Sequence, residues 1–370
     1  ICSGRSVCVG IEDSINGISS GNAAGMKVIH IPDTIEINDD IRRLTSVVCH
    51  SLSDVPDIID TWNEGKIADV EGYYENAKIN RVYVDRVHVK KAFAEYTAAY
   101  NADDPKIKLK IDHTYRVAAL CERIAKAAGM CAYDVELAWL SGMLHDVGRF
   151  EQIKRYNTFS DADSVDHAKF GADLLFKDGL ISTFLNGMVK CTGYKPGTLE
   201  DRYSSDGVFL YDRLNKSDME MLELAIRCHN MYRIPQGLNS REQAFCNVLR
   251  DADKVDIFKV NIDTPLEEIY NTTTEELMKS DITDEVLEAF DEEHCILKAI
   301  RRTPADTVIG HVSLAYELVY DESVRITVEQ GYLAKLMHFH SDNEETNRKM
   351  AMVREKMDSY VKKRIGEKDA

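Results

Sequence analysis

The chain has 370 residues, of which 44% are hydrophobic and 29% charged, and its formal net charge is −17. The length allows two or three domains with large cores, and the composition is ordinary for a globular protein. The negative charge disfavours binding to a nucleic-acid duplex, and the sequence shows neither an apolar run of the ~20 residues that span a membrane nor a signal peptide.

The first 62 residues predict a small α/β segment. Residues 6–11 form a short apolar run that ends at Glu12 and Asp13, a helix of small residues follows, and residues 26–31 form a second strand. This order is typical of a β-α-β unit in a parallel sheet. Acidic residues at the carboxyl end of such a strand lie where α/β sites form.

The stretch CVGIEDSINGISSGNAAGMKVIHIPD closely resembles the last part of haloacid-dehalogenase-type phosphatases and β-phosphoglucomutases. The resemblance implies that Glu12 and Asp13 belong to a vestigial Mg²⁺ site, because carboxylates suit that hard ion. The nucleophile and cap of this family lie upstream of the matched part, so we expect residues 1–62 to be a partial domain without chemistry of its own. Because the chain opens at Ile1, almost inside a strand, we also expect it to begin partway through a longer protein.

The remainder of the chain predicts an all-helical architecture. Residues 63–105 are polar and predict a helical linker, residues 106–260 a helical domain, and residues 261–370 a helical C-terminal extension. Glycines, prolines and cap-type residues delimit the helices. In the second domain, helices are predicted from Lys106 to Ala128, up to a stop at Gly148, from a cap at Ser164, from Ser217 and from Ser240.

Several of these helices carry a histidine or an aspartate in line with their own apolar residues. One helix face, for example, carries Val135, Ala138, Gly142 and His145. The apolar stripe on this face therefore ends in a histidine, a residue type that commonly binds metals. One such histidine is usually a satisfied core residue. Several converging ones are hard to explain that way, because a bound metal ion would satisfy buried polar groups that are otherwise costly. The residues concerned are His113, His145, Asp146, His167, His229 and Asp253.

Four of these residues form an H…HD…D order that resembles the signature of the HD-domain metal-dependent phosphohydrolases, over about residues 106–258. His167 and His229 match the members of this family that hold two metals. The resemblance implies metal-activated water as the nucleophile and Asp146 as the catalytic bridge between two ions. Imidazole and carboxylate ligands suit Mn²⁺, Fe²⁺, Co²⁺ or Ni²⁺, whereas Mg²⁺ is less natural here.

Two details narrow the interpretation. Asp253 is taken as the last ligand because it lies four residues past Leu249, whereas Asp251 is expected on the solvent side. Arg149 stands where HD-GYP proteins carry lysine, and no G-Y-P triplet follows, which argues against cyclic-dinucleotide hydrolysis.

Basic residues that follow the His-Asp turn are the candidates for holding a phosphate, arginine with two parallel hydrogen bonds. Loops predicted at 150–163 and 177–216 are expected to set substrate specificity. The substrate-binding candidates are Arg149, which is also a catalytic candidate, Lys154, Arg155 and Lys169.

The C-terminal extension predicts apolar helix faces that pack on the helical domain or on a second subunit, so a homo-oligomer is one interpretation. Its histidines, His294, His311, His338 and His340, are interpreted as surface or packing residues. The nine cysteines of the chain include no C-x-x-C pair, which favours free thiols in the reducing cytoplasm.

The leading prediction is a cytoplasmic metal-dependent phosphohydrolase, either a phosphomonoesterase or a phosphodiesterase. We expect its substrate to be a nucleotide or a related phosphoester, and we expect no membrane partner. One alternative is a haloacid-dehalogenase-type phosphatase or sugar-phosphate mutase in which the HD part is accessory. The other is a metal-binding regulatory module without turnover.

Overall fold

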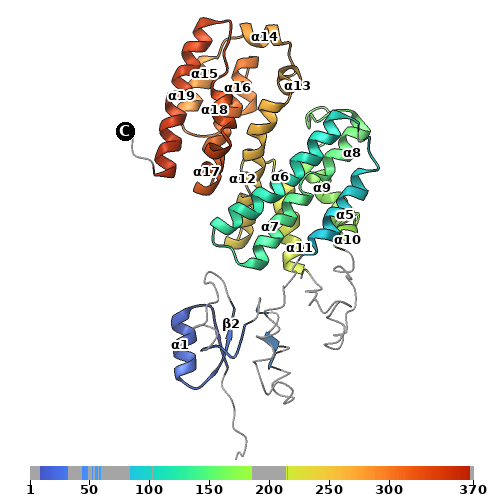
Figure 1. Ribbon diagram of the computed structural model, residues 1–370, viewed down its shortest axis with the longest axis vertical. Helices are drawn as coiled ribbons and strands as arrows, with labels where there is room; N and C mark the ends of the chain where they lie inside the picture. The colour runs from blue at the N-terminus through green and yellow to red at the C-terminus, as the bar shows by residue number, and fades with distance from the viewer. Residues whose placement is uncertain are drawn as a thin grey trace, which may run out of the picture. The chain divides into compact units, whose positions relative to one another are not determined.

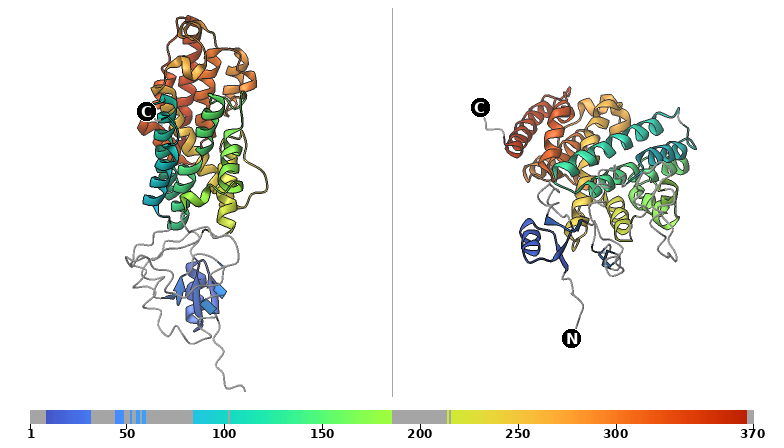
Figure 2. Two further views of the ribbon diagram at one scale, coloured as in Figure 1. Left: turned by 90° about the vertical axis from the view of Figure 1, so that its right-hand side faces the viewer. Right: turned by 60° about the horizontal axis from the view of Figure 1, so that its bottom comes forward.

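The computed structural model of the chain is mostly helical with one small parallel sheet, and this confirms the predicted fold class (Figure 1, Figure 2). None of the described helices has the length and apolar character that crossing a membrane requires. Two compact units are present, one of residues 1–89, 129–137 and 185–214, the other of residues 90–128, 138–184 and 215–370. The predicted domain boundaries stay predictions. The structure describes residues 9–31, 44–48, 52, 55–56, 58–59, 84–101, 103–185, 214 and 216–366.

The first unit contains the predicted β-α-β segment. Its strands are parallel in the order β1-β2-β3. Ile29 lies in one apolar cluster and its neighbour Val28 in another, as expected when successive side chains of a strand point to opposite faces. The elements are β1 (Val9–Glu12), α1 (Ile15–Ala23), β2 (Lys27–His30) and β3 (Val47–Val48).

The helices that follow match most of the predicted ones. The long helix α6 begins as its sequence predicts, because Asp104 accepts a hydrogen bond from the backbone of Lys106 and Pro105 occupies the first turn. The helices up to residue 263 are α5 (Arg86–Thr97), α6 (Pro105–Ala127), α7 (Ala132–Leu144), α8 (Val147–Tyr156), α9 (His167–Ala172), α10 (Ile181–Phe184), α11 (Lys216–Cys228) and α12 (Ser240–Asp263), with a π-helix, η3 (Asp173–Lys177), after α9.

Three local predictions were wrong. Gly148 does not stop a helix but lies in the first turn of α8, so residues 150–156 are helical and the loop begins at Asn157. The cap of α9 is Asp166 rather than Ser164, because the Asp166 side chain accepts from the backbone of Lys169. Helix α10 occupies part of the predicted loop at 177–216, most of which lies outside the described residues.

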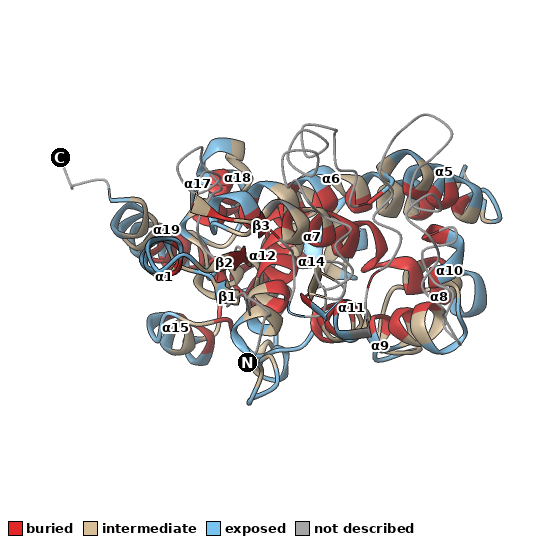
Figure 3. Cartoon of the chain, turned by 90° about the horizontal axis from the view of Figure 1, so that it is seen from below, coloured by how far each residue is buried: buried red, intermediate tan, exposed pale blue. Residues whose placement is uncertain are grey.

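Helix α12 is the central element of the second unit. It packs against α6 and α11 within the helical domain, and also against α17 and α18 of the C-terminal extension. Most of its residues between Phe245 and Asn261 are buried, as the red ribbon of Figure 3 shows. Both of its sides therefore face protein. A helix covered on both sides can hold a polar cluster on one face while it anchors a second set of helices on the other.

The C-terminal extension forms its own apolar cluster, which includes Phe258 of α12, so its predicted packing on the helical domain is confirmed. Val308 of α16 and Leu336 of α18 belong to the same cluster. The elements of the extension are α13 (Leu266–Tyr270), α14 (Thr274–Lys279), α15 (Asp284–Asp291), η5 (Lys298–Ile300), α16 (Pro304–Val312), η6 (Ser313–Glu317), α17 (Asp321–Gln330), α18 (Tyr332–Met337) and α19 (Glu344–Ile365).

Asp251 is buried, and the prediction that it lies on the solvent side was wrong. Its carboxylate accepts hydrogen bonds from the backbone N–H groups of Val319 and Tyr320, at 2.9 Å each, and from the Ser323 hydroxyl at 2.7 Å. These donors stand at the start of α17, so Asp251 caps that helix from α12. The side chain thereby joins the extension to the helical domain.

We predict that Asp251→Ala lowers the free energy of unfolding by about 3 kcal/mol, because it leaves buried donors without acceptors. Urea denaturation of the two proteins measures this change. Asp263→Ala on the same helix is the control, since it breaks only a partly exposed ion pair with Lys259 and should cost less than about 1 kcal/mol. Equal losses in the two variants would contradict the assigned role.

Candidate metal centre

His145 and Asp146 lie in the tight turn that joins α7 to α8, and both side chains are buried. Asp146 occupies the N-cap position of α8, where an aspartate normally accepts a hydrogen bond from the helix backbone. Here the side chain makes no capping bond. Its carboxylate is therefore available to the interior of the domain.

A contact between two glycines brings α9 against this turn. A Cβ atom on Gly148 would lie 2.5 Å from the carbonyl oxygen of His167 and 2.7 Å from the backbone nitrogen of Gly171. Only glycine permits that approach. The contact places His167, the first residue of α9, beside Asp146.

The Nδ1 atom of each of four buried histidines lies at hydrogen-bond distance from an oxygen. Backbone carbonyls and ionised carboxylates only accept, so each of these bonds requires a proton on Nδ1. In a neutral ring the lone pair is then on Nε2. The Nδ1 bonds join His113 to Asp256 (2.6 Å), His145 to the carbonyl of Gly142 (2.8 Å), His167 to Asp161 (2.7 Å) and His229 to the carbonyl of Ile226 (2.7 Å).

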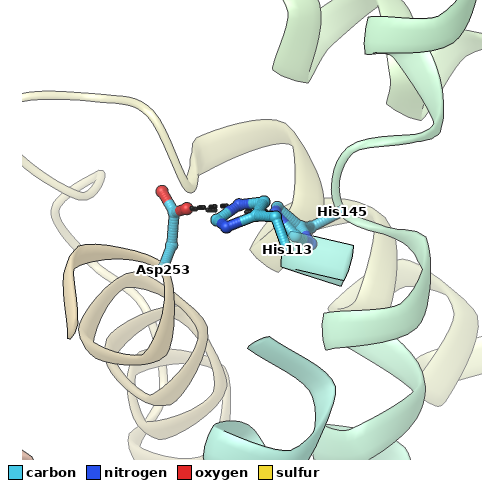
Figure 4. A group of neighbouring side chains, drawn as sticks. All are labelled: His113, His145 and Asp253. Atoms are coloured by element: carbon cyan, nitrogen blue, oxygen red, sulfur yellow. Dashed lines mark hydrogen bonds and ion pairs between the residues drawn. The ribbon is translucent and has the colours of Figure 1, made fainter. Parts of the chain in front are cut away.

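The four Nε2 atoms converge on one place. Those of His113 and His145 are 3.3 Å apart, and those of His167 and His229 are 3.1 Å apart. Oδ1 of Asp253 lies 3.2 Å from Nε2 of His113. Figure 4 shows Asp253 facing the rings of His113 and His145. Lone pairs that face one another at these distances repel unless a cation lies between them. The arrangement is that of metal ligands whose tautomer is fixed by outer hydrogen bonds.

The carboxylate of Asp146 stands between the two histidine pairs. Its Oδ2 lies 3.6 Å from Nε2 of His113 and 3.5 Å from that of His145. Its Oδ1 lies 3.6 Å from Nε2 of His167 and 3.8 Å from that of His229. Oδ1 is buried and has no hydrogen-bond partner. Each oxygen is thus matched with one pair of imidazoles.

These residues could hold a metal ion, and their donors divide into two sets, each with its own candidate position. The first position is formed by His113, His145, Asp253 and Oδ2 of Asp146, and the second position by His167, His229 and Oδ1 of Asp146. Among the described residues, three sets of possible ligands have their ligand atoms within 4.8 Å of one another: His113 with His145 and Asp253, His145 with Asp146 and His229, and Asp161 with Asp166 and His167. The second of these sets takes residues from both positions. The mixed nitrogen and oxygen donors suit first-row transition ions.

Burial determines most of the protonation states. It lowers the pKa of His145, and it lowers the pKa values of His167 and His229 to about 4, so these rings are neutral near pH 7 and able to bind a metal. Burial also disfavours a charge on His113, but hydrogen bonds with Asp253 and Asp256 outweigh it and raise the pKa of that ring. The pKa of Asp146 is well below its usual value, because Lys110 and the neighbouring imidazoles outweigh its burial.

Three cations surround the cluster, and two of them hold its outer carboxylates. Arg116 pairs with Asp256 through Nε at 2.6 Å. Arg149 donates through one nitrogen to Asp161 at 2.9 Å, to Gln152 and to the carbonyl of Phe159. The third cation, Lys110, binds Oδ2 of Asp146 directly at 2.7 Å.

Of the four predicted phosphate-binding residues, the structure places Arg149 near the cluster and gives the other three ion pairs outside it. Arg149 is near the cluster, with Nε 3.8 Å from Oδ1 of Asp146. Lys154 and Arg155 both pair with Glu151, and Lys169 pairs with Asp166, all three with side chains more than half exposed. These three ion pairs do not involve the six predicted ligands. As substrate-binding residues they stay untested predictions that the geometry does not favour.

Sequence reasoning missed three residues of the site: Lys110, Asp161 and Asp256. Lys110 and Asp256 were within reach of it, because each lies three residues from a predicted ligand, His113 or Asp253, and so shares its helix face. Asp161 follows no helical period, since it lies in the loop before α9. A residue such as Asp161 could be sought because a buried metal-binding histidine needs an oxygen that accepts a hydrogen bond from Nδ1.

The other predicted sites lie apart from this cluster. Glu12 ends β1 and Asp13 follows it, at the carboxyl edge of the small sheet as expected. Among the described residues, the groups able to hold a metal include neither of them, and their Mg²⁺ site stays a prediction. In the C-terminal extension, His338 and His340 are exposed and His294 bonds to Glu292. His311 is half-buried and packs its ring against that of Tyr270.

A helical domain that encloses histidines and aspartates in this arrangement is typical of metal-dependent hydrolases. The family model of the HD domain matches residues 111–259, and the chain thus contains an HD domain that includes all six predicted ligands. No curated protein and no solved structure matches the chain. The resemblance of residues 1–62 to haloacid dehalogenases has no support from these comparisons.

We predict that His167→Ala keeps the first position but loses the second, because it removes one of the three donors assigned to it. After dialysis against Mn²⁺ the variant should hold about one ion per chain, compared with about two in the wild type. Elemental analysis of the protein measures this. His338→Ala, an exposed histidine, should leave the content unchanged. Complete loss of metal from His167→Ala would show that the two positions are not separate.

We predict that Gly148→Ala destabilises the protein by about 1–3 kcal/mol, because the added methyl group meets backbone atoms that cannot move without separating α8 from α9. Urea denaturation measures the loss. Gly171→Ala is the comparison, since its added atom would come no closer than 3.1 Å to the same contact and should cost less. A Gly148→Ala protein as stable as the wild type would contradict the close contact.

Proposed function

We propose that the HD domain of this chain is a metal-dependent phosphohydrolase that acts on a small phosphorylated molecule, a nucleotide or a related phosphoester. The observation that carries this proposal is the set of four imidazoles whose Nε2 lone pairs converge on the two oxygens of one buried aspartate. HD domains are generally found in metal-dependent hydrolases, and residues 111–259 form such a domain.

Divalent ions held by these residues would supply a bound water of lowered pKa and a positive charge for the phosphate oxygens. Mn²⁺, Fe²⁺, Co²⁺ or Ni²⁺ fit the donors better than Mg²⁺ does. The chain itself provides three things. Asp146 stays ionised between the two histidine pairs, Asp161 and Asp256 fix the rings of His167 and His113, and Arg149 holds Asp161 in place.

The haloacid-dehalogenase alternative has one structural observation in its favour. β1 and β2 are parallel and Glu12 lies at the end of β1, which is the arrangement expected for an acidic site at a strand's carboxyl end. The described part of that unit offers no further ligand group beside it. A homo-oligomer and a cytoplasmic location also stay predictions. The described cysteines are free thiols, which supports a reducing compartment.

The experiment that tests the proposal compares the wild type with Asp146→Ala in a panel of phosphomonoesters and phosphodiesters, with bound metal measured in the same samples. We expect the variant to stay folded, to lose metal, and to lose more than the ~10–100-fold in activity that removal of an outer-shell partner costs. Asp163→Ala, an exposed aspartate of the nearby loop, should resemble the wild type.

Two results would contradict the proposal. Undiminished turnover by Asp146→Ala would show that the hydrolysis occurs elsewhere in the chain. A wild-type protein that holds metal but leaves every phosphoester intact would favour the regulatory module.

A further inference from the structure

Lys110 places a positive charge directly at the metal centre. It lies one turn before His113 on α6, so both side chains project from the same helix face. Its Nζ is 2.7 Å from Oδ2 of Asp146, the oxygen assigned to the first position. No other lysine makes a hydrogen bond or ion pair with one of the six predicted ligands among the described residues.

The Lys110 ammonium retains capacity to bind a ligand. It has three N–H donors, and Asp146 is its one hydrogen-bond partner within the part of the chain that the structure describes. Its side chain is 18% exposed, so the group is reachable from solvent. Arg149 differs in this respect, because one of its nitrogens already donates to Gln152, Phe159 and Asp161.

Phe159 fixes the position of Lys110. The centroid of its ring lies 5.7 Å from Nζ of Lys110 and 5.6 Å from Cζ of Arg149, both at cation–π distance. Its carbonyl oxygen accepts a hydrogen bond from Arg149 at 2.7 Å. One half-buried aromatic residue thus holds two cations, one beside each oxygen of Asp146.

The balance of charge changes when a divalent ion binds Oδ2 of Asp146. The ion then neutralises the carboxylate, and the ammonium beside it becomes an uncompensated positive charge at short range. An anion that contacts both the ion and Lys110 removes this repulsion. A phosphate group has the charge and the several acceptor oxygens that this requires.

We propose that Lys110 binds the phosphate group of the substrate and that Phe159 is the positioning residue that holds its ammonium at the first position. The inference rests on the proposed function and identifies the residue that selects a phosphorylated substrate. The phosphate-binding role is thus assigned to a lysine inside the centre. The sequence had predicted this role for Lys154, Arg155 and Lys169, but their side chains pair with Glu151 and Asp166.

The competing explanation is that Lys110 only neutralises Asp146. The two roles differ in what they do to metal binding. A lysine that supports the aspartate would be needed for metal affinity, whereas a phosphate-binding lysine competes with the ion for Oδ2. Its removal should then leave metal affinity unchanged or increased.

The test measures binding of inorganic phosphate, by isothermal titration calorimetry, to full-length protein loaded with Mn²⁺ and freed of excess metal. We expect Lys110→Met to keep the wild-type metal content and to bind phosphate at least about 10-fold more weakly, the loss of one charge-assisted hydrogen bond. Lys110→Arg should recover part of the affinity. Lys126→Met is the matched control, an exposed lysine on the same helix that should leave phosphate binding unchanged.

Phe159 is tested in the same assay with Phe159→Leu and Phe159→Tyr. Leucine retains the apolar bulk but loses the ring, so we expect weaker phosphate binding with unchanged metal content. Tyrosine retains the ring and should restore the wild-type affinity, which a purely packing role would not require. With a substrate identified from the panel, Phe159→Leu should raise KM more than it lowers kcat.

The outcomes separate this inference from the function on which it rests. Wild-type phosphate affinity in Lys110→Met would overturn it, and so would loss of metal from that variant, which would assign Lys110 to the support of Asp146. A wild-type chain that holds no metal would overturn the proposed function itself.

Discussion

The second unit is built around buried imidazoles whose lone pairs repel one another, and the protein alone relieves this repulsion only in part. Backbone carbonyls and carboxylates take up the Nδ1 protons of His113, His145, His167 and His229, and this directs four Nε2 lone pairs toward one another. Burial lowers the pKa values of His145, His167 and His229. These three rings are therefore neutral at neutral pH, and protonation does not remove the repulsion between their lone pairs. Metal ions satisfy the lone pairs and the carboxylates together, and this is the strongest physical reason for a metal centre.

The elements around the centre can be understood as means of holding that unfavourable arrangement. The glycine contact between α8 and α9 brings His167 to the turn that carries Asp146. Helix α12 supplies Asp253 and Asp256 on one side, while Asp251 on its other side caps α17. The C-terminal extension thereby stabilises the helix that carries the last predicted ligand. Burying polar groups at the centre lowers the stability of the fold, and packing in other parts of the unit offsets this loss. Such compensation is common around functional sites.

The sequence predicted the helical domain and the six ligand-type residues, because helical periodicity and the order of histidines and aspartates are both local patterns. It failed where the outcome depended on tertiary packing. Asp251 and Asp253 lie about 200° apart on a helix, and one was expected to face solvent. Both are largely enclosed, because α12 is covered on two sides. Lys110 and Asp161 were missed because lysine and aspartate are common surface residues, and only the fold brings them to Asp146 and His167.

The most direct test of the central claim is anomalous X-ray diffraction from crystals of the full-length protein grown with Mn²⁺. We expect two peaks that flank Asp146, roughly 3.5–4 Å apart, one coordinated by Nε2 of His113 and His145 and the other by Nε2 of His167 and His229. Absence of manganese from both oxygens of Asp146, with the four imidazoles turned apart, would contradict the account.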